Sequence, residues 1–221
     1  LKINPNYVDA HNNLGIILQA LGELQKAVDC YEKAIQIQPE DAYAYFNLGL
    51  VFKELGEFQK AVDCYEKAIQ IRPDRIEDVY VSLGLVFKEL GEPQKAISCY
   101  EKAIEIQPNY AEAHNNLGVV FNKLEEPQKA MSCYEKAIEI QPNYAEAHNN
   151  LGLVFYELGE PQKAMSCYEK AIEIQPDHAI AHSNLSMLLL LLSDFDKGFE
   201  YYEWRKKIIT NQDYSEYLKL N

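Results

Sequence analysis

Five cysteines recur at almost constant spacing, and their residue type could support redox or metal chemistry. They are Cys30, Cys64, Cys99, Cys133 and Cys167, separated by 34 or 35 residues. Cysteines at one position of successive stacked units lie too far apart for a disulfide, which requires Cα atoms about 4.4–6.8 Å apart. An odd number also leaves one cysteine unpaired. We therefore predict small apolar packing residues in a protein of a reducing compartment, the cytoplasm.

Histidines repeat with a similar period and could bind metal. Four share one position, namely His11, His114, His148 and His182. His178 and His182 are four residues apart and could hold a metal from one helical face, but no third ligand lies near them in the sequence. Phosphate-binding glycine loops and nucleophile elbows are absent from the sequence. We predict no metal, no other cofactor and no catalytic activity in this segment.

A third repeating side chain is asparagine, whose carboxamide carries two donor hydrogens and an acceptor. It occurs at Asn13, Asn47, Asn116, Asn150 and Asn184, and Ser82 interrupts the series. A carboxamide can pair with a peptide group on both sides without regard to side chain, so such a ladder could hold an extended ligand. The alternative is that each asparagine bonds the backbone of a neighbouring unit.

These spacings arise because most of the chain is one unit of about 34 residues, repeated. A period in this range predicts a solenoid whose units stabilise one another by stacking. We predict the end of a preceding repeat at residues 1–7, and then repeats at 8–41, 42–75, 76–110, 111–144 and 145–178, a divergent sixth repeat or cap at 179–209, and a tail at 210–221.

Each unit carries the apolar pattern of two amphipathic helices. In the fourth unit, Leu117, Val120 and Phe121 have helical spacing, and Tyr134 and Ala137 follow after a break. The break is usually Leu-Gly-Glu, where glycine tolerates the positive φ that ends a helix. A proline often opens the second helix, where no amide donor is needed. We predict an all-α solenoid of about a dozen helices.

The pattern resembles the tetratricopeptide repeat (TPR) family. In the second unit it is present as Tyr45, Leu48, Gly49, Phe52, Ala61, Tyr65 and Pro73. The sequence departs from the family at the four histidines, at Glu125 in place of the break glycine, and at Gly198 and Arg205 in place of alanines. The resemblance implies a right-handed superhelix of antiparallel helix pairs, whose concave groove is lined by the second, fifth, sixth, ninth, twelfth and thirteenth positions.

The remaining groove positions describe the expected ligand. Beside the ladder the predicted site contains Asn12, Asn115 and Asn149 at the fifth position, Ile16, Leu50, Leu85, Val119 and Leu153 at the ninth, and Glu112 and Glu146 at the second. An acidic groove with an apolar floor favours an extended protein or peptide segment that is neutral to basic. The basic residues of a carboxylate clamp for acidic chaperone tails are missing.

Composition narrows the class of partner further. The formal net charge is −13, whereas a nucleic-acid binder would show a basic patch, so we predict no nucleic-acid partner. The longest apolar run, Met187–Leu192, is too short for a membrane span. No signal peptide is recognisable.

The two ends and one junction depart from the repeat. Leu1–Pro5 has the pattern of a preceding second helix, so we expect an upstream part. Met187, Leu190 and Leu191 form an apolar stripe that is either a buried cap or a docking patch for a following domain or the tail. The extra residue within residues 74–78 predicts a local change of superhelical twist.

Three functions fit these observations. The first is a protein-interaction scaffold that binds extended peptides in the groove. The second is the substrate-recruiting arm of a larger glycosyltransferase, because the ladder resembles the groove of the TPR superhelix of O-linked N-acetylglucosamine transferases, and residues 198–205 resemble the end of arrays in bacterial TPR glycosyltransferases. The third is homo-oligomeric assembly, in which the C-terminal tail enters the groove of a neighbouring copy.

Overall fold

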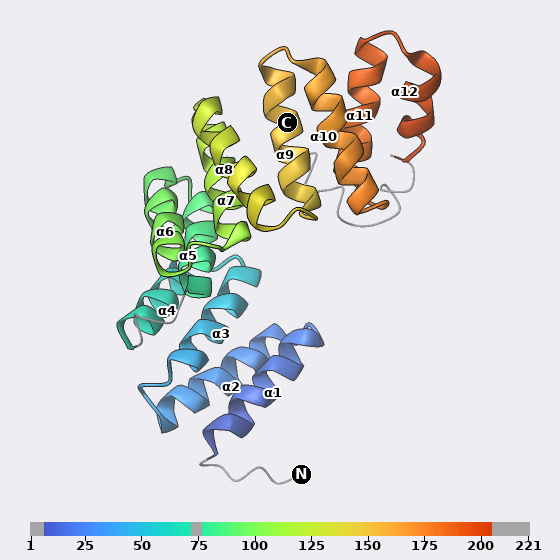
Figure 1. The fold of residues 1–221 in the computed structure, drawn as a ribbon. Helices are drawn as coiled ribbons and strands as arrows, with labels where there is room; N and C mark the ends of the chain where they lie inside the picture. The colour runs from blue at the N-terminus through green and yellow to red at the C-terminus, as the bar shows by residue number, and fades with distance from the viewer. Residues whose placement is uncertain (1–6, 72–76, 205–221) are drawn as a thin grey trace. The chain divides into compact units, whose positions relative to one another are not determined.

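The computed structural model describes residues 7–71 and 77–204 of the 221-residue chain. Over these residues the chain forms twelve α-helices and no strand (Figure 1). The helices are α1 (Val8–Ala20), α2 (Leu24–Ile37), α3 (Ala42–Glu54), α4 (Phe58–Ile71), α5 (Glu77–Glu89), α6 (Pro93–Ile106), α7 (Ala111–Lys123), α8 (Pro127–Ile140), α9 (Ala145–Glu157), α10 (Pro161–Ile174), α11 (Ala179–Leu191) and α12 (Phe195–Tyr202). The prediction of an all-α protein with about a dozen helices is confirmed.

The turn inside each helix pair requires a residue with positive φ. Glycine supplies it at Gly22, Gly56, Gly91 and Gly159, with φ between 71° and 74°. Two turns use other residues, Glu125 at φ 58° and Ser193 at φ 65°. A side chain in this conformation costs about 1–2 kcal/mol. The predicted glycine stop is therefore confirmed at four turns, and the fourth and sixth repeats end their first helices with a strained residue.

Close packing inside each pair depends on a second glycine and a tyrosine. A Cβ atom added to Gly49 or Gly118 would lie 2.5 or 2.7 Å from the ring of Tyr65 or Tyr134. These rings are 0% and 2% exposed, so they have no room to move. Glycine at this position lets the first helix lie directly on the tyrosine ring of the second helix.

The chain folds as two compact units, unit 1 (Leu1–Ala113) and unit 2 (His114–Asn221). In unit 1, α1 packs on α2, α3 on α4 and α5 on α6, and α2 and α4 also contact the first helix of the next pair. In unit 2 the same order holds from α8 to α12. First helices of neighbouring pairs also touch, as α1 does α3, α3 does α5 and α9 does α11.

Apolar side chains from three consecutive helix pairs fill the core of unit 2. Its buried members include Tyr134, Leu151, Phe155, Tyr168 and Leu185. Each layer of this core is shared by neighbouring pairs, which is why a single pair cannot bury its own apolar face.

Several predictions concern residues outside the described ranges. They are the preceding repeat at residues 1–7, apart from Tyr7, the change of twist at residues 74–78, which the structure describes only from Glu77 onward, the departure at Arg205 and the tail at residues 210–221. The superhelical shape and the repeat boundaries stay predictions. We propose to keep the predicted repeat numbering, with Glu77 at the first position of repeat 3, to compare equivalent side chains.

Candidate peptide-binding surface

The first helices of each unit present the predicted groove positions as a row. In unit 1 the ninth-position side chains Ile16, Leu50 and Leu85 lie on α1, α3 and α5, with Ile16 exposed and the other two half-buried. In unit 2, Val119 on α7 and Leu153 on α9 are half-buried. Each unit therefore has an apolar strip in contact with water along neighbouring first helices.

The fifth-position asparagines are buried, in contrast to this strip. Asn12, Asn115 and Asn149 are only 4–5% exposed. Asn12 donates from Nδ2 to Oδ2 of Asp41, 2.8 Å away at the start of α3. These side chains lie between neighbouring repeats, so their polar atoms are bonded within the protein.

In unit 2 the fifth-position asparagines bond the ladder asparagines of the following repeat. Asn150 donates from Nδ2 to Oδ1 of Asn115 at 3.0 Å. Asn184 donates from Nδ2 to Oδ1 of Asn149, also at 3.0 Å. Two neighbouring first helices are thus joined by a carboxamide pair at each of these two junctions.

Unit 1 contains the same two residue types without this bond. Asn47 at the ladder position of repeat 2 is buried, as is Asn12 in repeat 1. Among the described residues, Oδ1 of Asn12 has no donor and Nδ2 of Asn47 has no acceptor. Such atoms are costly when buried. The Nδ2 atom of Asn12 is instead bonded to Asp41.

The ladder therefore divides by environment. Asn13 is exposed and Asn116 is half-buried, and no hydrogen bond within the described ranges engages their carboxamides. The serine that interrupts the ladder, Ser82, is buried. Of the predicted ladder, Asn13 and Asn116 keep a donor and an acceptor for a ligand, whereas the amide groups of Asn150 and Asn184 bond a neighbouring repeat.

Acidic side chains border the strip in both units. Glu112 and Glu146 are exposed. Partial removal of its carboxyl group from water, together with the negative charge of Asp78, raises the pKa of Glu112, while Lys53 opposes this shift. Asp78 also accepts a hydrogen bond from the hydroxyl of Tyr110. Two carboxylates thus lie close together in unit 1 and would attract a cationic group.

The histidines of unit 2 have local structural contacts. His148 and His182 bond through Nε2 to the carbonyl oxygens of Pro142 and Pro176, at 3.0 and 2.9 Å. His178 is the N-cap of α11, where its Nδ1 accepts from the amide of Ala181. Within the part of the chain that the structure describes, no group of three or more histidine, cysteine or acidic side chains could hold a metal.

No disulfide joins the five cysteines, all of which the structure describes. Burial raises the pKa of the Cys64 and Cys99 thiols to about 12. The thiolate, which is the nucleophile and the metal ligand, is therefore scarce at neutral pH. Packing is the role that this environment supports.

The predicted docking patch is split by the fold. Met187 and Leu191 are 47% and 62% exposed, whereas Leu190 is half-buried. A Cβ atom on Gly198 would lie 2.6 Å from Cδ2 of Leu190, so the missing side chain lets α12 approach α11. The carbonyl of Gly198 also accepts from Oγ of Ser186 at 2.8 Å.

The carboxamide pairing was missed by the sequence analysis, although the sequence contains a signal for it. Asparagine at the fifth position of one repeat is followed by asparagine at the sixth position of the next, as in Asn115 and Asn150. Where the fifth position is apolar, as at Phe46, the next sixth position is Ser82. Pairwise reading across repeats, instead of down one column, would have found it.

Helix pairs that stack through shared layers place the chain among the helical-hairpin repeat proteins, and sequence comparison identifies the family. Profiles described as tetratricopeptide repeat match residues 6–74 and 110–177, and residues 167–200, and one described as TPR repeat matches residues 84–125. The chain belongs to the tetratricopeptide repeat family. Comparison with curated proteins gave no significant match.

Solved structures with the same fold include other TPR proteins. A crystal structure of MamA is 26% identical, covers 78% of this chain and 93% of its own, and superposes with a TM-score of 0.66. YrrB, described as a TPR protein with an unusual peptide-binding site, is 29% identical, covers 80% and 91%, and has a TM-score of 0.62. PilF of Pseudomonas aeruginosa, at 22% identity, covers 97% of both chains with a TM-score of 0.80 and shows the fold alone.

Family and fold support a protein-interaction scaffold. None of the helices in the described ranges has the length and apolar character needed to cross a membrane.

Proposed function

We propose that the chain acts by binding, as a scaffold that holds extended peptide segments along the first helices of each unit. The observation that carries this proposal is the pairing of an uncommitted carboxamide with an apolar strip. In unit 1 these are Asn13 and the strip of Ile16, Leu50 and Leu85. In unit 2 they are Asn116 and the strip of Val119 and Leu153.

The expected ligand is an unfolded segment that is neutral to basic. A carboxamide bonds a peptide group whatever its side chain, so Asn13 and Asn116 would give sequence-tolerant binding. The half-buried ninth positions would take small apolar side chains, and Glu112 and Glu146 would favour Lys or Arg in the ligand. The peptide-binding site named for YrrB supports such a role in a similar array.

The test compares two asparagines of the same column. Asn116→Ala removes an uncommitted carboxamide, whereas Asn150→Ala removes one that is bonded to Asn115. Fluorescence polarisation with a panel of unstructured peptides should show weaker binding to Asn116→Ala across many sequences alike. Asn150→Ala should lower stability with a smaller effect on affinity. Equal affinities for wild type and Asn116→Ala would contradict the proposal.

Two narrower roles are proposed as alternatives. The substrate-recruiting arm of a glycosyltransferase is supported by the resemblance of the ladder, and a transferase domain in the same polypeptide would establish it. Self-association through the tail at residues 210–221 is tested by the mass in solution with and without those residues, and an unchanged monomer in both would exclude it. Buried thiols fit a reducing location, and we propose the cytoplasm.

A further inference from the structure

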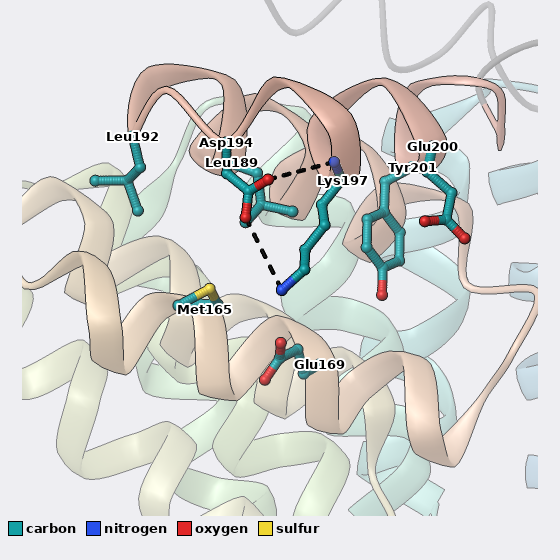
Figure 2. Close-up of a pocket in the computed structure, with 8 residues that line it drawn as sticks. All are labelled: Met165, Glu169, Leu189, Leu192, Asp194, Lys197, Glu200 and Tyr201. Atoms are coloured by element: carbon teal, nitrogen blue, oxygen red, sulfur yellow. Dashed lines mark hydrogen bonds and ion pairs between the residues drawn. The ribbon is translucent and has the colours of Figure 1, made fainter.

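A second surface with binding chemistry lies away from the ladder, between α10, α11 and α12 of unit 2. It is a cleft of about 430 Å³ (Figure 2). Its apolar lining is Met165, Leu189, Leu192 and the ring of Tyr201. Its polar lining is Glu169, Asp194, Lys197 and Glu200, which Figure 2 shows around the same opening.

Four other repeats show what normally lies at this position. A lysine of the second helix lies 5.1 Å above the ring of a phenylalanine eight residues earlier, on the first helix. The pairs are Phe52 with Lys60, Phe87 with Lys95, Phe121 with Lys129, and Phe155 with Lys163. In each, the lysine also pairs with a glutamate three residues before it. The repeat thus contains a cation–π stack on its outer side.

Repeat 6 keeps the lysine and loses the ring. Lys197 has the register of the other four lysines, but the residue eight positions earlier is Leu189. Its ion pair with Asp194 is long, at 3.9 Å, whereas Lys95 and Lys129 lie 2.5 Å from their glutamates. Lys197 is therefore held less firmly than its equivalents and has no ring beneath it in the same repeat.

Other residues that line the cleft also differ from the repeat. The equivalent cleft of unit 1 is lined by Phe87, Lys95, Ser98 and Cys99. In repeat 6 the corresponding residues are Leu189, Lys197, Glu200 and Tyr201. A carboxylate and an aromatic ring thus replace two small side chains.

The charge of the cleft defines the occupant further. Three carboxylates and one ammonium line it, so the lining has a formal charge of −2. Burial raises the pKa of Tyr201, and the neighbouring carboxylates of Glu169 and Glu200 raise it further. A negative rim around an apolar floor matches an apolar side chain with cationic neighbours.

We propose that this cleft binds a partner protein through one aromatic side chain flanked by Lys or Arg. The ring would occupy the space that phenylalanine fills in repeats 2 to 5 and would lie beneath Lys197. The flanking cations would pair with Glu169 and Glu200. This site is separate from the ladder surface and does not depend on peptide binding there.

The probes are acetylated, amidated pentapeptides titrated into the full chain and followed by NMR. One has a central phenylalanine between lysines, a second has alanine at the centre, and a third has phenylalanine between glutamates. We expect the first to shift the signals of Leu189 and Tyr201. The alanine peptide should bind at least tenfold more weakly, about 1.4 kcal/mol. Equal binding of the phenylalanine and alanine peptides would overturn the proposal.

Two variants separate the ring site from the charges. Leu189→Phe restores the ring of the other repeats and should abolish binding of the phenylalanine peptide, with binding to the ladder surface unchanged. Glu169→Gln/Glu200→Gln should weaken the lysine peptide by about three- to tenfold and remove the preference over the glutamate peptide. Wild-type binding in either variant would contradict the proposal, and the second variant keeps the test valid if the first does not fold.

Discussion

Unit 1 and unit 2 contain the same ladder of asparagines but use it differently. In unit 2, Asn150 and Asn184 each donate to the fifth-position asparagine of the preceding repeat. In unit 1, Asn47 is equally buried, yet its Nδ2 atom and the Oδ1 atom of Asn12 lack partners among the described residues. The neighbouring side chains, and not the repeat position alone, determine what an asparagine does.

This difference teaches how a repeat can divide its labour. A carboxamide that bonds the next repeat stabilises the stack and is unavailable to a ligand. One that lacks such a partner, such as Asn116, keeps its hydrogen-bonding capacity. The ladder is therefore a mixture of structural and ligand-accessible groups.

A change that should affect both units alike sets the scale. Gly49→Ala and Gly118→Ala each place a Cβ atom 2.5–2.7 Å from a buried tyrosine ring. Overpacking of this kind costs about 1–3 kcal/mol, more than the helix propensity gained by alanine. Hydrogen exchange in the affected helix pair should show the loss, while Ser98→Ala on the exposed face of α6 should show little change. Unequal losses would show that the two units tolerate overpacking differently.

The comparison is sharpened most by the ladder itself. Asn184→Ala leaves the buried Oδ1 of Asn149 without its donor and should cost about 1–3 kcal/mol. Asn47→Ala removes a buried donor that has no partner in the described structure and should cost at least about 1 kcal/mol less. Denaturant unfolding of the two variants measures this difference. Equal destabilisation would break the distinction between the units.

The turns offer a smaller contrast. Glu125 holds φ at 58°, where Gly159 holds 73° in the next repeat. Glu125→Gly should stabilise the chain by about 1 kcal/mol, because glycine has no steric penalty there. Gly159→Ala should destabilise it by a similar amount. Thermal unfolding checks both signs, and a loss of stability in Glu125→Gly would mean that its side chain makes a compensating contact.

The smallest expected effect is a pH dependence in unit 1. The pKa of Glu112 is raised above its ordinary value of 4.5, so the folded state holds this proton more tightly than the unfolded chain does. Its contribution to stability is present below pH 4.5 and is lost as pH rises through the raised pKa. Glu112→Gln should therefore be more stable than wild type at pH 7, by a few tenths of a kcal/mol because the group is exposed.

The control for this prediction is the same substitution beside a neutral neighbour. In an Asp78→Asn background the gain from Glu112→Gln should shrink, because part of the shift comes from the charge of Asp78. Urea unfolding at pH 4 and pH 7 gives both values. A gain at pH 4 as large as that at pH 7 would contradict this origin.

The sequence predicts the fold well because its signals are local and repeated. The period of the apolar residues predicts the helices, and glycines such as Gly56 mark their ends at positive φ. The role of each asparagine was not predictable in the same way, because it depends on a side chain about 35 residues away. The Asn150 bond to Asn115 needs both residue types at one junction. The cleft beside Lys197 likewise appears only when Leu189 is compared with the phenylalanines of other repeats.

The most direct test of this account is to watch the asparagine side chains during a peptide titration. The carboxamide NH2 groups give separate signals in a ¹H–¹⁵N NMR spectrum, assigned here by substituting one asparagine at a time. On addition of an unstructured, neutral-to-basic peptide, we predict that the signals of Asn13 and Asn116 shift while those of Asn150 and Asn184 stay in place. Shifts at Asn150 and Asn184 with none at Asn13 and Asn116 would contradict the account.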